Sequence, residues 1–139
     1  MDAIQQLVDD HNKVRDLFKQ FSQLGHPAIA QEICRRLTVH STLEEEIVYP
    51  VLRDRVDAGM ADEAEEEHAQ VKELIEEIET MDEGEELENA MAVLEREVEH
   101  HVEEEEGEVF PKLEAELGPE TLELGRELFR RRQDLLPET

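Results

Sequence analysis

Apolar side chains recur every three or four residues over four long stretches of the chain. This spacing is typical of one face of an amphipathic α-helix. In the first stretch, for example, Leu7, Val14, Phe18 and Phe21 follow it. The four stretches cover about residues 2–24, 27–56, 61–81 and 85–116. Clusters of glycine, proline and acidic residues separate them, so the pattern predicts four long helices joined by short loops.

Short loops between long helices favour antiparallel neighbours. We therefore predict an all-α fold, an up-down-up-down four-helix bundle over about residues 2–116. Gly118 and Pro119 introduce a short fifth helix, about 119–134, which is expected to cap one end of the bundle or to pack on its side. A chain of 139 residues favours a single domain, here 1–139.

Two prolines fall inside the predicted helices. Pro50 lies in the second stretch and Pro111 in the fourth. Because proline lacks a backbone N–H and its ring clashes with the preceding turn, each is expected to kink or end its helix.

The charge of the chain restricts its partners. A formal net charge of -25 argues against binding of nucleic acid or of an anionic membrane surface, since both would be repelled. No apolar run approaches the roughly 20 residues that span a bilayer. The single cysteine, Cys34, and a start without an apolar leader favour a cytoplasmic protein. The oligomeric state is left open, and Cys34 is expected to be buried and inert.

Two segments of the chain repeat at a constant offset of 61 residues. Residues 37–52 read LTVHSTLEEEIVYPVL, and residues 98–113 read VEHHVEEEEGEVFPKL. The matching pairs are His40 and His101, Glu44 and Glu105, Tyr49 and Phe110, and Pro50 and Pro111. A further inward histidine precedes each segment, His11 in the first half and His68 in the second. The chain thus reads as two helical hairpins that a pseudo-twofold axis can relate.

These histidines and glutamates form a candidate metal site. His-x3-Glu alone is weak evidence, because glutamate is so frequent here that such pairs arise by chance. It gains weight because His40, Glu44 and their counterparts fall on the apolar stripes, where residues i and i+4 share one face. A lone inward histidine is more often a hydrogen-bonded core residue, and an acid can lie at a helix edge. Two buried carboxylates would repel each other, however, whereas a metal ion removes this cost. Mixed nitrogen and oxygen ligands suit iron or manganese better than structural zinc.

The arrangement resembles the hemerythrin-like, HHE cation-binding domains over about residues 5–115. The resemblance rests on His11, on His40 to Glu44 with Tyr49-Pro50, on His68, and on His101 to Glu105 with Phe110-Pro111. It implies two iron ions, one bound by His11 and His40 and the other by His68 and His101. Glu44 and Glu105 would bridge the two, together with an oxo or hydroxo group.

One departure from the family pattern bears on function. Oxygen-carrying hemerythrins have a second histidine one turn from the first on the third helix, where this chain has Ala64 and Lys72. With fewer ligands from the protein, more coordination positions on the metal ions would be open to a small molecule. The resemblance therefore favours binding or sensing of O2, NO or H2O2, or iron handling, over oxygen transport. An enzyme that decomposes hydrogen peroxide or oxidises ferrous iron is an alternative. A passive metal store or a zinc-binding structural bundle is another.

Four further features lie outside this set of six residues, and two of them have competing interpretations. Tyr49 is either an aromatic core residue before proline or a hydroxyl that reaches the metal centre. His26 and His100 are expected to lie on the surface. The arginines at 130–132 are expected to balance the acidic bundle and the C-terminal end of their helix, and a surface that recruits an acidic partner is the alternative.

Overall fold

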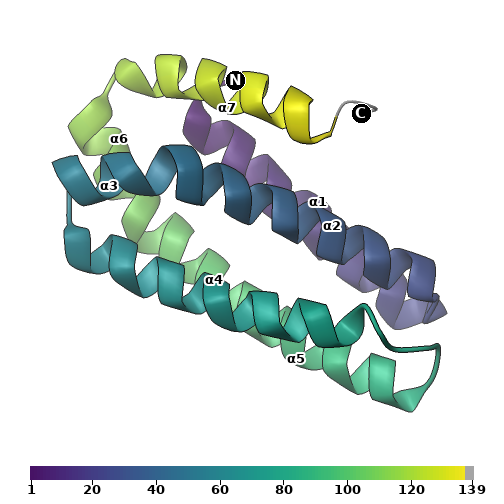
Figure 1. Ribbon diagram of the computed structural model, residues 1–139. Coiled ribbons are helices and arrows are strands. Elements are labelled where there is room, and N and C mark those ends of the chain that lie inside the picture. The colour runs from purple at the N-terminus through teal and green to yellow at the C-terminus, as the bar shows by residue number, and fades with distance from the viewer. Residues whose placement is uncertain (137–139) are drawn as a thin grey trace.

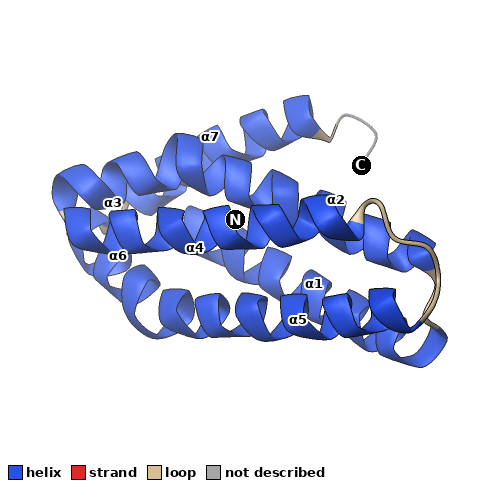
Figure 2. Ribbon diagram, turned by 60° about the horizontal axis from the view of Figure 1, so that its bottom comes forward, coloured by secondary structure: helices blue, strands red, loops and turns tan. Residues whose placement is uncertain are grey.

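The computed structural model describes residues 1–136, and this part of the chain is helical with no strand (Figure 2). The elements are α1 (Ala3–Leu24), α2 (Pro27–Leu43), η1 (Glu44–Val48), α3 (Tyr49–Arg55), α4 (Ala58–Ile78), α5 (Glu85–Glu104), η2 (Glu105–Val109), α6 (Phe110–Leu117) and α7 (Glu120–Leu135). The two η elements are π-helical turns. The predicted all-α class is confirmed.

The elements form four long helical segments, which we call arms, and one additional helix, α7. The second arm is α2, η1 and α3 in one run, and the fourth is α5, η2 and α6. Successive arms run in opposite directions, with α1 beside α2 and α4 beside α5 (Figure 1). Helix α7 packs along α1 and α2, so it lies on the side of the arms, one of the two placements expected from the sequence.

Local residue choice explains where the helices begin and end. The Asp2 carboxylate accepts the Gln5 backbone N–H at 2.8 Å and so caps α1. Gly25 ends α1 in a left-handed conformation, φ 66°, which glycine adopts without strain. The third long helix was expected from about 61 to 81 but runs from Ala58 to Ile78. Its start is earlier because the Asp57 carboxylate accepts the Met60 backbone N–H.

The two internal prolines do not end their helices. A π-turn precedes each proline, and the proline falls in the first turn of the α-helix that follows, where its missing N–H is tolerated. In each π-turn a backbone N–H reaches back five residues, from Tyr49 to the Glu44 carbonyl and from Phe110 to the Glu105 carbonyl. Of the two expected outcomes, a kink or an end, termination does not occur, because the helical run continues past both Pro50 and Pro111. The turn expands instead, as π-bulges in α-helices do.

The apolar core is divided into two clusters with a polar layer between them. On α1, Leu7 belongs to one cluster and Val14 to the other, and His11 lies between. On α5 and η2, Leu94 and Val109 bracket the layer in the same way. Both sides of the layer are thus sealed by packed side chains. Among the described residues, no helix is long and apolar enough to cross a bilayer.

Candidate metal centre

All six residues predicted from the sequence meet in the polar layer. They come from all four arms: His11 on α1, His40 on α2, Glu44 at the start of η1, His68 on α4, His101 on α5 and Glu105 at the start of η2. Five of them are buried, both carboxylates almost completely, and the His101 side chain is 12 % exposed. The structure therefore brings together every residue that the spacing singled out.

The six side chains form two groups of three that could each hold a metal ion. His11, His40 and Glu105 make one group, and Glu44, His68 and His101 make the other. We call them the first and second half-site. In each group the ligand atoms lie within 4.8 Å of one another.

Glu105 faces both half-sites. Its Oε1 lies 3.2 Å from His11 Nε2, and its Oε2 lies 3.3 Å from His101 Nε2. Glu44 Oε1 lies 3.3 Å from His40 Nε2 and 3.1 Å from His68 Nε2. Both carboxylates thus stand between the two groups, as bridging ligands would.

Each of the four histidines presents Nε2 to the centre and Nδ1 to a carboxylate outside it. The Nδ1 contacts are His11 to Glu106 at 2.7 Å, His40 to Asp10 at 2.9 Å, His68 to Glu45 at 2.8 Å and His101 to Glu67 at 2.6 Å. Such carboxylates orient metal-binding imidazoles and make them more basic.

The four outer carboxylates obey the same pseudo-symmetry as the ligands. Asp10 and Glu67 each precede the inward histidine of their half, and each contacts the other histidine of that half. Glu45 and Glu106 each follow a glutamate ligand and contact a histidine of the opposite half. Sequence reasoning missed all four. Their placement beside the ligands at matching positions was the available signal, but the abundance of acidic residues hid it.

When its imidazoles are neutral, as metal binding requires, the centre is lined with electron pairs. A carboxylate can only accept, so Nδ1 donates, and the neutral imidazole then has its lone pair at Nε2. His68 Nε2 and His101 Nε2 lie only 3.1 Å apart. Among the described residues, three buried side-chain atoms have no hydrogen-bond partner, and two of them, His40 Nε2 and Glu44 Oε2, are in this centre. Converging lone pairs and orphaned buried acceptors fit a bound cation.

Charge attraction within the centre shifts the pKa values of both residue types. Burial alone would lower the pKa of His40, but Glu44 and Asp10 outweigh burial and raise it well above its usual value. Burial and the Glu44 carboxylate raise the pKa of Glu105, but His101 opposes them, and the net pKa falls to about 2. Without a metal ion, protons on the histidines balance the carboxylates, so cations and protons compete for this centre.

The hydroxyl of Tyr49 lies in the middle of the second half-site. It donates to Glu105 Oε2 at 2.8 Å and lies 3.1 Å from Glu44 Oε1. It is also 3.0 Å from His68 Nε2. The side chain is fully buried, as a core residue would be, and its hydroxyl also reaches the candidate ligands. Its counterpart Phe110 stacks on His11 at 5.8 Å between ring centroids and has no hydroxyl, so the half-sites differ here.

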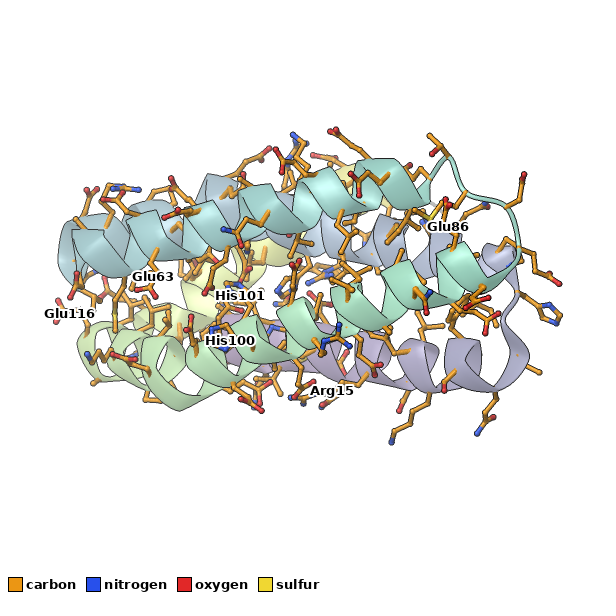
Figure 3. All side chains as sticks on the ribbon, turned by 90° about the horizontal axis from the view of Figure 1, so that it is seen from below. Arg15, Glu63, Glu86, His100, His101 and Glu116 are labelled. Atoms are coloured by element: carbon orange, nitrogen blue, oxygen red, sulfur yellow. The ribbon has the colours of Figure 1, made fainter. Side chains whose placement is uncertain are left out.

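The second half-site is close to the face formed by α4 and α5. A small pocket of about 80 Å³ is lined by Glu67 and Glu104 and reaches His101 and Glu105. Figure 3 shows His100 and His101 on α5 and Glu63 on neighbouring α4. His100 is 65 % exposed, as expected, and its ring lies 3.0 Å from Glu104. His26 is exposed as well, and Cys34 is buried with a free thiol.

Two of the three C-terminal arginines make specific contacts rather than a diffuse charge balance. Arg132 donates from Nη1 and Nη2 to the two oxygens of Asp10, each at 2.9 Å. Arg131 donates to Glu46 at 2.8 Å and 3.2 Å. Arg130 is 71 % exposed. Helix α7 is thereby joined to Asp10, which contacts the candidate ligand His40, and to the surface residue Glu46.

An all-helical chain with buried histidine and glutamate clusters defines a candidate metal-binding helical protein. Comparison with known proteins narrows this class. The family profile described as "Hemerythrin HHE cation binding domain" matches residues 2–113, and the chain belongs to that family. The predicted resemblance is confirmed.

Two further comparisons place the chain among other proteins. It is similar to a protein from Nostoc sp. (strain PCC 7120 / SAG 25.82 / UTEX 2576) named "DNA nickase", with 33 % identity over 119 residues. The match covers 82 % of this chain but only 34 % of the relative, so the chain spans about a third of that protein's length. No solved structure matches the chain significantly.

Proposed function

We propose that this chain is a non-haem di-iron protein that interacts with dioxygen or a related small oxidant, NO or H2O2. The observation that carries the proposal is the convergence of four imidazole Nε2 atoms and two carboxylates, with every Nδ1 held by an outer carboxylate. Antiparallel arms in a four-helix bundle would supply the rigid frame, with ligands projecting inward from facing helices.

The ligand set and its surroundings divide the work. His11, His40 and Glu105 would hold one iron ion, and Glu44, His68 and His101 the other, with both carboxylates bridging. Iron bound there would supply the redox chemistry. The protein orients the imidazoles, excludes water through its two apolar clusters, and leaves space for a small molecule beside His101.

Iron is favoured over structural zinc by the type and number of the ligands. Structural zinc sites are closed and four-coordinate and are dominated by cysteine and histidine. Here each half-site offers three side-chain ligands with carboxylates shared between them, and the one cysteine, Cys34, is packed in an apolar cluster and belongs to neither group. This set suits a metal that accepts mixed nitrogen and oxygen ligands and open positions.

Metal content and absorption spectrum test the proposal. The protein is expressed with iron and zinc both available, purified, and measured for both metals before and after exposure to air. We expect about two irons per chain and an oxo-to-iron charge-transfer absorption under air. His101→Ala and Glu44→Ala should lose iron, whereas His100→Ala, which changes an exposed neighbour, should keep it. Zinc in place of iron, or well under two irons, would refute the proposal.

A second candidate is an enzyme that decomposes hydrogen peroxide or oxidises ferrous iron. The Tyr49 hydroxyl favours it, because a hydroxyl 2.8 Å from a candidate bridging carboxylate could relay a proton between oxygen atoms during either reaction. Oxygen evolution from added peroxide, lost in Glu44→Ala, would support this activity. Iron-loaded protein that evolves no oxygen and oxidises no added ferrous iron would exclude it.

The name of the Nostoc relative does not transfer to this chain. The chain spans about a third of that protein, and its net charge of -25 opposes approach to a phosphate backbone. We therefore expect no binding to duplex DNA at physiological salt. A gel-shift assay with the iron-loaded protein tests this expectation.

A further inference from the structure

The two half-sites differ in what holds their outer carboxylates. Asp10, beside the first half-site, is gripped by both ends of the Arg132 guanidinium, and its Oδ2 also accepts from His40 Nδ1 at 2.9 Å. Its counterpart Glu67, beside the second half-site, has no arginine contact among the described residues, where its neighbours are His100, His101 and Glu104. One half-site is thus tied to helix α7, and the other faces the α4–α5 surface.

We propose that Arg132 is a positioning residue for the first half-site, acting through Asp10 on His40 and coupling metal binding there to the docking of α7. The inference rests on the proposed di-iron centre. A planar guanidinium that donates two hydrogen bonds to one carboxylate fixes the orientation of the carboxylate and balances its charge. The ammonium group of lysine cannot reproduce this two-point geometry.

The position of the arginine supports a directed role. Arg132 and Asp10 are 20 % and 13 % exposed, so their pair is more shielded from water than the other arginine pairs of α7. The same helix is held close to α1 elsewhere, since Gln6 Nε2 donates to the Gly125 carbonyl at 2.8 Å. A movement of α7 therefore moves the Arg132 guanidinium, which holds the Asp10 carboxylate that orients His40.

Coupling of this kind must act in both directions. If docking of α7 favours the metal-binding position of His40, then a metal ion bound to His40 must favour docking of α7 to the same extent. The structure gives the connecting groups in one unbroken series, from Arg132 to Asp10 to His40, with each contact at 2.9 Å. Within residues 1–136, no such series leads from α7 to His101.

The first measurement is ferrous iron binding without oxygen, in competition with a chromogenic chelator, for the unchanged protein, Arg132→Lys and Arg132→Gln. Loss of an outer carboxylate contact costs about 10- to 100-fold in metal affinity. We expect one of the two iron equivalents to weaken about tenfold in both variants, and the other to stay unchanged. Arg131→Gln is the matched control, because Arg131 lies on the same helix and pairs with Glu46, which touches no ligand.

The second measurement separates positioning from general stabilisation. Hydrogen exchange of α7 backbone amides is followed with and without ferrous iron. Iron should slow this exchange in the unchanged protein and in Arg131→Gln, but not in Arg132→Lys, whereas slowing in α1 should persist in all three. Equal weakening of both irons, an Arg132→Lys variant that behaves like the unchanged protein, or α7 exchange indifferent to iron would each overturn the inference. Fewer than two irons in the unchanged protein would instead refute the di-iron centre itself.

Discussion

Replacing Tyr49 by phenylalanine removes one oxygen atom from the middle of the second half-site. The fold should accept the change, because Phe110 already fills the symmetry-related place. The hydroxyl donates to Glu105 at 2.8 Å, and a hydrogen bond to a charged group contributes about 1.5–3 kcal/mol. In the variant, Glu105 Oε2 retains its contact with His101 Nε2 at 3.3 Å. We therefore expect the lost hydrogen-bond energy to be near the lower end of this range, about 1.5 kcal/mol, which corresponds to roughly a tenfold change in rate.

The assay compares iron content, visible spectrum and the rate of reaction with peroxide in Tyr49→Phe. We expect two irons to be retained and the peroxide reaction to slow about tenfold. Thr121→Val is the matched control: it removes another buried hydroxyl, which donates to the Gly118 carbonyl at 2.8 Å. It should lower stability without changing the iron chemistry. Unchanged peroxide kinetics in Tyr49→Phe would refute the assigned role. A phenolate-to-iron band, present only with Tyr49, would show a direct ligand instead.

Three further predictions follow from the described contacts. Gly125→Ala should destabilise the protein by about 1–3 kcal/mol in urea unfolding, because a Cβ there would lie 2.7 Å from the Met1 carbonyl oxygen, whereas Gly107→Ala meets no atom within 4 Å and should not. Burial raises the pKa of the Cys34 thiol to about 11, so alkylation at pH 8 should be about 100-fold slower in the native protein than in urea, as mass spectrometry can show. Because His40 has a raised pKa in the metal-free protein, ferrous iron should displace protons at pH 7, and calorimetry in two buffers of different ionisation enthalpy should reveal their release. The raised pKa of His40 also makes the stability of the metal-free protein depend on pH. Protonation of His40 contributes fully to the free energy of unfolding below about pH 6.5, and this contribution is lost as the pH rises through the folded-state pKa.

The helices and the six inward residues could be predicted from the sequence because each depends on local periodicity. Apolar residues at 3.6-residue spacing define a face, and His40 and Glu44 share that face one turn apart. Because the surrounding residues also recur at an offset of 61, chance is an implausible origin for the two His-x3-Glu pairs, even in a glutamate-rich chain. Helix ends were less predictable: the cap at Asp57 moved the start of α4 to Ala58.

The role of Tyr49 could not be obtained in this way. Tyr49 is five residues beyond Glu44, about 140° round an ideal α-helix, so α-helical spacing separates the two side chains. The π-turn that begins at Glu44 changes the rotation and brings the hydroxyl within 3.1 Å of the carboxylate. A π-turn has no strong sequence signature, although proline at the same offset in both halves was compatible with one.

The outer contacts escaped prediction for a different reason. Asp10 and Arg132 are 122 residues apart, and only the packing of α7 on α1 brings them together. In so acidic a chain, the position of Asp10 beside His11 is too weak a signal to distinguish it from the many other acids before the fold is known.

The pseudo-twofold repeat makes the remaining differences between the halves informative. Ligands, outer carboxylates and π-turns all match, so duplication alone would give two equivalent half-sites. Equivalence is broken in two places, by the hydroxyl of Tyr49 and by the cover of α7 with Arg132. Both differences make the second half-site the more suitable one for a reaction. The first half-site is held from outside by a fifth helix, whereas the second has a proton donor and a pocket beside His101. A small oxidant should therefore react at the second half-site, and the first should keep its metal ion more rigidly.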